Sequence, residues 1–152
     1  MKLKKYGNNI LLFEFKTQKE MALTFFRVQE FYESKNENLL EKPFSVFEFL
    51  EESMDKYGFM DYFYFWSGFN LPGRVLNRWV DSRPGPTYFT HLEHELVTLV
   101  NENVNIHDDY YVIGCKKKDK MTLKHEMAHA LYHTDIEYRF CMNIVTNDLK
   151  TN

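Results

Sequence analysis

Apolar residues recur through much of the chain at intervals of three and four residues, the spacing that places side chains on one face of a helix. The first stripe of this kind predicts a helix that begins at Thr17 and ends before Ser34. Thr17 and Glu20 form the capping-box pattern with which many helices begin. The stripe consists of Met21, Phe25, Val28 and Tyr32.

Four further segments are predicted to be helical. One runs from Pro43 to a stop at Gly58, a short one covers residues 75–80, and one follows a second capping box and ends near residue 103. The last extends from Ile136 to Leu149. Its expected inward side chains are Tyr138, Cys141, Met142 and Val145.

Strands are expected to be fewer and shorter. Residues 2–6 and 9–16 predict a hairpin, and residues 62–66 and 110–113 predict one strand each. Residues 68–73 hold two glycines and a proline, so they are interpreted as a turn. Helical stripes outweigh strands, and we expect an α+β fold: a single compact domain over residues 1–152, with a small, mainly antiparallel sheet packed on the helix that contains residues 123–131.

Composition narrows the class of protein. The chain has 152 residues, of which 44% are hydrophobic, and a net charge of −3 without a basic face, so no nucleic-acid partner is expected. No apolar run approaches the ~20 residues of a membrane span, and the amino-terminal segment lacks the features of a signal peptide. Cys115 and Cys141 do not have metal-site spacing and are predicted to be buried free thiols. These features together favour a cytoplasmic protein without a membrane partner.

One short motif carries a chemical prediction. His125, Glu126 and His129 form the pattern His-Glu-x-x-His. On a helix the two histidines would lie about 40° apart and about 6 Å along the axis, which suits two imidazoles that bind one metal ion. Glu126 would lie beside them as a general base for a water on the metal. The predicted cofactor is Zn²⁺, and Asp119 is the predicted N-cap of this helix.

A catalytic zinc usually has a third protein ligand, and two carboxylates compete for that role. Glu137 lies eight residues after His129, and a chain reversal near residues 133–134 would bring it level with His129. Asp135 lies six residues after His129, but a tyrosine precedes it where a tight turn would need glycine. We favour Glu137. His133 lies about 12 Å along the axis from His125 and is not expected to share the ion.

The segment His125-Glu126-Met127-Ala128-His129 resembles the zincin metallopeptidases. Its apolar flanks are similar to those of compact intracellular members such as ImmA/IrrE-like and SprT-like proteins, and to small bacterial and phage proteins with the same motif. The resemblance covers about 17 of 152 residues. It implies a zincin-like domain in which His125 and His129 are zinc ligands and Glu126 is the general base. It also implies that a tyrosine, Tyr138 or Tyr132, could steady the oxyanion.

The first hypothesis is therefore a cytoplasmic zinc metalloprotease whose substrate is a peptide or protein. The strand at residues 110–113 is expected to pair with an extended peptide above the motif helix. The second hypothesis is a zinc-dependent endoribonuclease resembling the YbeY proteins, in which Asp135 would be the third ligand. The third is a non-catalytic, zinc-stabilised accessory or binding protein, in which four protein ligands would leave no position for water.

Overall fold

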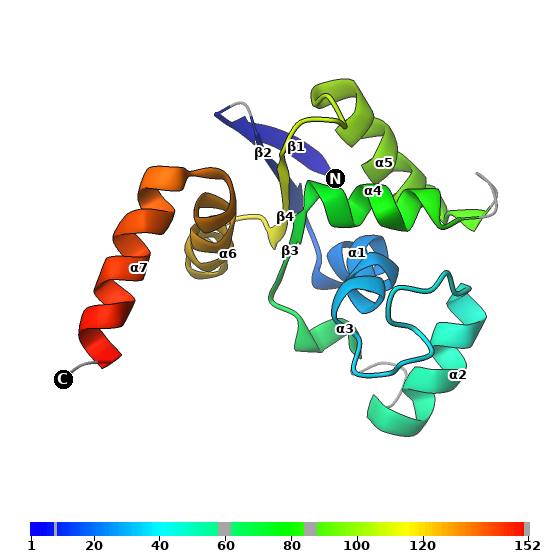
Figure 1. The fold of residues 1–152 in the computed structure, drawn as a ribbon. Coiled ribbons are helices and arrows are strands. Elements are labelled where there is room, and N and C mark those ends of the chain that lie inside the picture. Colours follow the sequence, from blue (N-terminus) through cyan, green and yellow to red (C-terminus); the bar gives the residue numbers. More distant parts are fainter. Residues whose placement is uncertain (8, 58–61, 84–87, 151–152) are drawn as a thin grey trace.

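A four-stranded sheet separates two unequal layers of helices (Figure 1). The computed structural model describes residues 1–7, 9–57, 62–83 and 88–150, and of residues 52–57 and 147–150 it describes the backbone alone. The strands are β1 (Lys2–Tyr6), β2 (Ile10–Phe15), β3 (Gly68–Pro72) and β4 (Tyr111–Lys116). The helices are α1 (Gln18–Glu33), α2 (Val46–Tyr57), α3 (Tyr62–Phe65), α4 (Gly73–Asp81), α5 (His91–Asn103), α6 (Lys120–Thr134) and α7 (Ile136–Lys150).

The strand order is β1-β2-β4-β3, so β4 lies inside the sheet and β3 at one edge. β1 with β2 and β3 with β4 are antiparallel pairs, whereas β2 and β4 run parallel. The register places Asn70 of β3 opposite Ile113 of β4. This mixed sheet with helices on both faces confirms the α+β prediction and the mainly antiparallel pairing.

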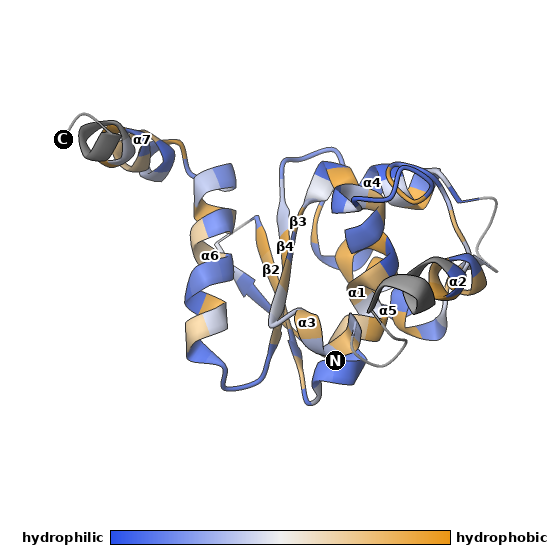
Figure 2. Cartoon of the chain, turned by 90° about the horizontal axis from the view of Figure 1, so that it is seen from below, coloured by the Kyte–Doolittle hydropathy of each residue, from blue (hydrophilic) through white to orange (hydrophobic). Residues whose placement is uncertain are grey.

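The alternation of side chains along the strands divides the core in two. Side chains of one parity face α1 and its neighbouring helices, which lie together on one side of the sheet (Figure 2). Aromatic rings dominate this part of the core. Side chains of the other parity face α6, which covers the opposite side of the sheet. Both faces of β2 are apolar because both are covered. The α6-facing cluster consists of Ile10, Leu12, Tyr111, Ile113, Cys115 and Ala130.

The helix starts that were predicted from capping boxes agree with the structure. Thr17 caps α1 by accepting a hydrogen bond from the backbone of Glu20, and Thr90 forms a complete capping box with Glu93. α2 begins later than expected, because Ser45 and not Pro43 lies at its start and exchanges hydrogen bonds with Glu48. The predicted stop at Gly58 lies outside the described residues.

Two predictions between residues 62 and 73 are wrong. The aromatic run begins with the short helix α3 instead of a strand, and the expected turn at residues 68–73 contains strand β3. β3 pairs with β4 along its whole length, and this long-range pairing outweighs the turn propensity of its glycine and proline. Pro72 is compatible with the strand because it lies at the end of an edge strand.

The final helix forms as predicted, but of its expected inward side chains only Tyr138 is partly buried. α7 contacts α6 and projects away from the rest of the molecule (Figures 1 and 2). Cys141, Met142 and Val145 are exposed, so the prediction of a buried thiol holds for Cys115 and is wrong for Cys141. Periodicity predicted the helix, whereas burial depended on a neighbour that the fold does not place there. No helix among the described residues has the length and apolar character needed to cross a bilayer.

Candidate metal centre

Helix α6 carries the motif, and both of its ends are fixed. Asp119 is its N-cap, as predicted, and accepts hydrogen bonds from the backbone and the hydroxyl of Thr122. At the other end Arg139 donates to the carbonyl oxygens of Tyr132 and His133. The apolar side of α6 packs on the sheet through Ala130, Leu123, Met127 and Leu131.

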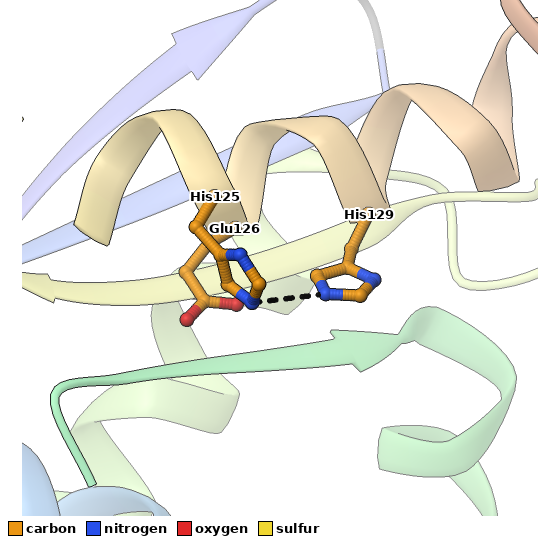
Figure 3. A group of neighbouring side chains, drawn as sticks. All are labelled: His125, Glu126 and His129. Carbon is orange, nitrogen blue, oxygen red and sulfur yellow. Dashed lines mark hydrogen bonds between the residues drawn. The ribbon is translucent and has the colours of Figure 1, made fainter. Parts of the chain in front are cut away.

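His125 and His129 lie one helical turn apart on the exposed side of α6 (Figure 3). Their Nε2 atoms face each other at 3.2 Å, and their ring planes are inclined at 80°. Two nitrogens at about 2.05 Å from a tetrahedral zinc would be about 3.3 Å apart. The observed separation therefore fits two imidazoles that share one ion, and neutral imidazole nitrogens are suitable zinc ligands.

Glu126 differs from the two histidines because it is buried, with 5% of its surface exposed. Its carboxylate lies close to both of them: one ligand atom from each of the three residues lies within 4.8 Å of the other two. Asn70 on β3 donates a hydrogen bond of 2.6 Å from Nδ2 to Oε2 of Glu126. The structure therefore brings together the three motif residues and adds a partner 56 positions away in the sequence.

Two further residues of the sheet complete the surroundings of Glu126. The hydroxyl of Tyr111 on β4 donates a hydrogen bond of 2.6 Å to Oδ1 of Asn70. Gly68 on β3 leaves room for the carboxylate, because a Cβ atom there would lie 2.7 Å from Oε1 of Glu126. Burial raises the pKa of Tyr111 well above its ordinary value, so its hydroxyl stays protonated and able to donate.

Asn70, Tyr111 and Gly68 were not predicted as site residues. A weak signal for Asn70 was available, since it is the one polar residue in the otherwise apolar segment Gly68–Pro72. That signal has a meaning only once residues 68–72 are known to form a strand. Sequence spacing could not show that Asn70 bonds to Glu126, because the two residues come together only through the register of β3 on β4, which places Asn70 beside α6.

The two candidate third ligands lie after the end of α6. Oδ1 of Asp135 accepts a hydrogen bond from the backbone N–H of Tyr138, so Asp135 caps α7. Glu137 is exposed on the first turn of α7. Among the described residues, the group that could hold a metal ion consists of His125, Glu126 and His129. Asp135 and Glu137 are not part of this group. The role of Glu137 stays a prediction.

The other residues considered in this region have separate partners. Nε2 of His133 lies 3.0 Å from a carboxylate oxygen of Asp109, and its ring lies against Tyr111. The hydroxyl of Tyr132 donates to Asn143 on α7. His91 and His94 are exposed on α5.

The expected peptide-pairing strand is in the wrong position for that role. β4 is hydrogen-bonded to β2 on one side and to β3 on the other, so it offers no free edge. β3 is the edge strand next to α6, and it passes below the two histidines in Figure 3. Any extended chain that joins the sheet beside the motif would therefore pair with β3.

Compared with models of known protein families, with curated proteins and with solved structures, the chain matches none. Only the chemistry of the site itself therefore indicates a function for this chain.

Proposed function

We propose that this protein is a zinc-dependent hydrolase of peptide bonds, with His125 and His129 as metal ligands and Glu126 as general base. The observation that carries the proposal is the 3.2 Å separation of the two histidine nitrogens, with the buried Glu126 carboxylate beside them. A third protein ligand is part of the proposal, with Glu137 favoured over Asp135 because Asp135 already caps α7.

Each residue has a distinct task in this proposal. Zinc at the two histidines would supply Lewis acidity, polarising a substrate carbonyl and making water more acidic. Glu126 would accept the proton of the attacking water and return it to the leaving amine. Burial of Glu126 suits this task, since it keeps the base beside the reacting groups and limits competition from bulk water.

An extended peptide is the substrate shape that the surroundings favour. β3 has a free edge among the described residues, and a chain that adds to a sheet edge gains backbone hydrogen bonds of low sequence selectivity. This edge belongs to the strand that also carries Asn70, the partner of Glu126. A peptide bound there would lie close to the proposed base.

The metal assignment is tested by elemental analysis of purified protein after incubation with zinc and removal of excess ion. We expect about one zinc per chain in the wild type and loss of most of it in His125→Ala and in His129→Ala. His91→Ala and His94→Ala are matched controls, because both remove an exposed histidine from another helix. Full zinc content in His125→Ala would refute the site.

The reaction is tested with fluorescein-labelled casein. Glu126→Gln should keep its zinc and lose hydrolysis by about 10²–10⁴-fold, the usual contribution of a positioned general base. Glu137→Ala should lose both zinc and hydrolysis if Glu137 is the third ligand, whereas Asp135→Ala should keep its zinc. Wild-type hydrolysis by Glu126→Gln would exclude the proposed mechanism.

A further inference from the structure

Three residues from different parts of the chain form a continuous hydrogen-bond chain that ends at Glu126. It runs from the hydroxyl of Tyr111 on β4 to Asn70 on β3, and from Asn70 to Glu126 on α6. We infer that Asn70, held by Tyr111, is a positioning residue that fixes the orientation of the Glu126 carboxylate. The catalytic consequence of this inference rests on the proposed function, whereas the orientation itself does not.

The chemistry of the three groups allows one arrangement of the Asn70 amide. An ionised carboxylate only accepts hydrogen bonds, so the group of Asn70 that faces Glu126 must be the NH₂. The amide oxygen then faces Tyr111, whose hydroxyl must donate. Both distances are 2.6 Å. If the Asn70 amide were rotated by 180°, its oxygen would face the carboxylate of Glu126. Both groups would then be acceptors, and no hydrogen bond could form between them.

Gly68 restricts the carboxylate from the other side. A Cβ atom at this position would lie 2.7 Å from Oε1 of Glu126 and 2.6 Å from Cγ2 of Thr122. A side chain at position 68 would therefore force the side chains of Thr122 and Glu126 to move. One oxygen of Glu126 is held by the Asn70 amide and the other lies against the backbone of Gly68, which leaves the carboxylate little freedom to rotate.

The fixed base contrasts with the two histidines. His125 and His129 are exposed, and their rings contact each other. They can adjust to an ion, but the Glu126 carboxylate is set by the sheet before any ion or substrate arrives. Preorganisation of this kind increases the rate and not the strength of substrate binding, because it lowers the cost of orienting the base for proton transfer.

The molecule offers a matched control for this chain. In the other layer the hydroxyl of Tyr110 donates to Oδ1 of Asn77 at the same distance, 2.6 Å. Nδ2 of Asn77 then donates to the backbone carbonyl of Ile106, at 2.8 Å, and not to a carboxylate. Disruption of this second pair reproduces the structural cost of losing a Tyr–Asn hydrogen bond without affecting Glu126.

The orientation is tested first by NMR of the protein without metal. We expect one side-chain amide proton of Asn70 to be shifted downfield and to exchange slowly with solvent, because it donates to a buried charged acceptor. Loss of the resonance in Asn70→Asp assigns it. In Glu126→Gln the shift should move upfield, whereas the amide of Asn77 should not change. An Asn70 amide that is identical in wild type and Glu126→Gln would refute the inference.

Kinetics on fluorescein-labelled casein then test the consequence. Asn70→Ala and Asn70→Asp should lower kcat about 10–100-fold, as expected when a supporting hydrogen bond is lost, with KM and zinc content nearly unchanged. Tyr111→Phe should lower kcat roughly 2–10-fold, and Tyr110→Phe should leave kcat unchanged. Wild-type kcat in Asn70→Asp would overturn the positioning role. If the wild type hydrolyses no casein, the proposed function fails and the NMR result alone decides the orientation.

Discussion

Cys115 and Cys141 show how far the chemistry of one residue type depends on its surroundings. Cys115 lies under α6 and is 2% exposed, whereas Cys141 is exposed on α7. Burial, with smaller effects from nearby carboxylates, raises the pKa of the Cys115 thiol to about 11. The thiolate is the reactive form of cysteine, so Cys115 should be inert where Cys141 reacts.

A thiol-specific reagent at pH 8 should therefore label one cysteine per folded chain and two after denaturation. Cys141→Ser should abolish labelling of the folded protein, and Cys115→Ser should leave it unchanged. Because the folded pKa of Cys115 lies above the unfolded value of about 9, the folded state keeps its proton longer. The protonated Cys115 thiol therefore contributes fully to the free energy of unfolding below pH 9, and this contribution should fall as pH rises from 9 to about 11. Rapid labelling of two thiols in the folded wild type would contradict the predicted inertness of Cys115.

At the scale of elements, α6 depends on its caps to present the motif in a fixed register. Asp119 lies about 1.7 turns before His125 and receives two hydrogen bonds from Thr122. The same bonds lower the pKa of Asp119 below its ordinary value. The depressed pKa means that this stabilisation is present above about pH 4 and is lost as pH falls through the folded pKa.

Asp119→Ala should accordingly lower the melting temperature at pH 7, because it removes the N-cap of α6. Asp119→Asn is the matched control, since asparagine also caps helices but does not titrate. It should melt close to the wild type at pH 7 and lose less stability than the wild type between pH 5 and pH 3. Circular dichroism melts of the three proteins at these pH values measure both effects. An Asp119→Ala protein as stable as the wild type at pH 7 would show that the cap contributes nothing.

Across the whole molecule, the helices differ sharply in the fraction of their apolar side chains that is buried in the core. Phe25 on α1 is fully buried, stacks on Phe69 and meets Phe15 edge to face. Phe140 on α7 is 67% exposed, and Ile136 on the same helix is 78% exposed. The aromatic cluster around α1 forms the larger part of the hydrophobic core. α7 packs against α6 and lies outside this cluster.

Phe25→Ala should therefore lower the free energy of unfolding by about 3–5 kcal/mol, the usual cost of removing a buried phenyl ring. Phe140→Ala makes the same chemical change on α7 and should cost less than about 0.5 kcal/mol. Denaturant unfolding of both variants, followed by circular dichroism, provides the comparison. Equal losses in the two proteins would show that α7 is packed into the core.

The sequence by itself determined those features whose causes are local. Capping boxes and helical stripes predicted the start of α1 and α5 and the existence of α7. The motif spacing predicted that His125, Glu126 and His129 would lie together, because one helical turn relates them. These predictions succeeded since each depends on residues within a few positions of one another.

The tertiary structure decided everything that depends on distant pairing. Turn propensity misled the prediction at residues 68–73 because the energy of pairing with β4 is not visible in that segment alone. The same pairing places Asn70 against Glu126 and, among the described residues, leaves the edge of the sheet beside α6 to β3 and not to β4. It also brings Gly68 so close to α6 that a Cβ atom there would clash with the side chains of Thr122 and Glu126. The exposure of α7 has the same origin: a stripe shows which side of a helix could be buried, and only the arrangement of the other elements supplies a surface to bury it against.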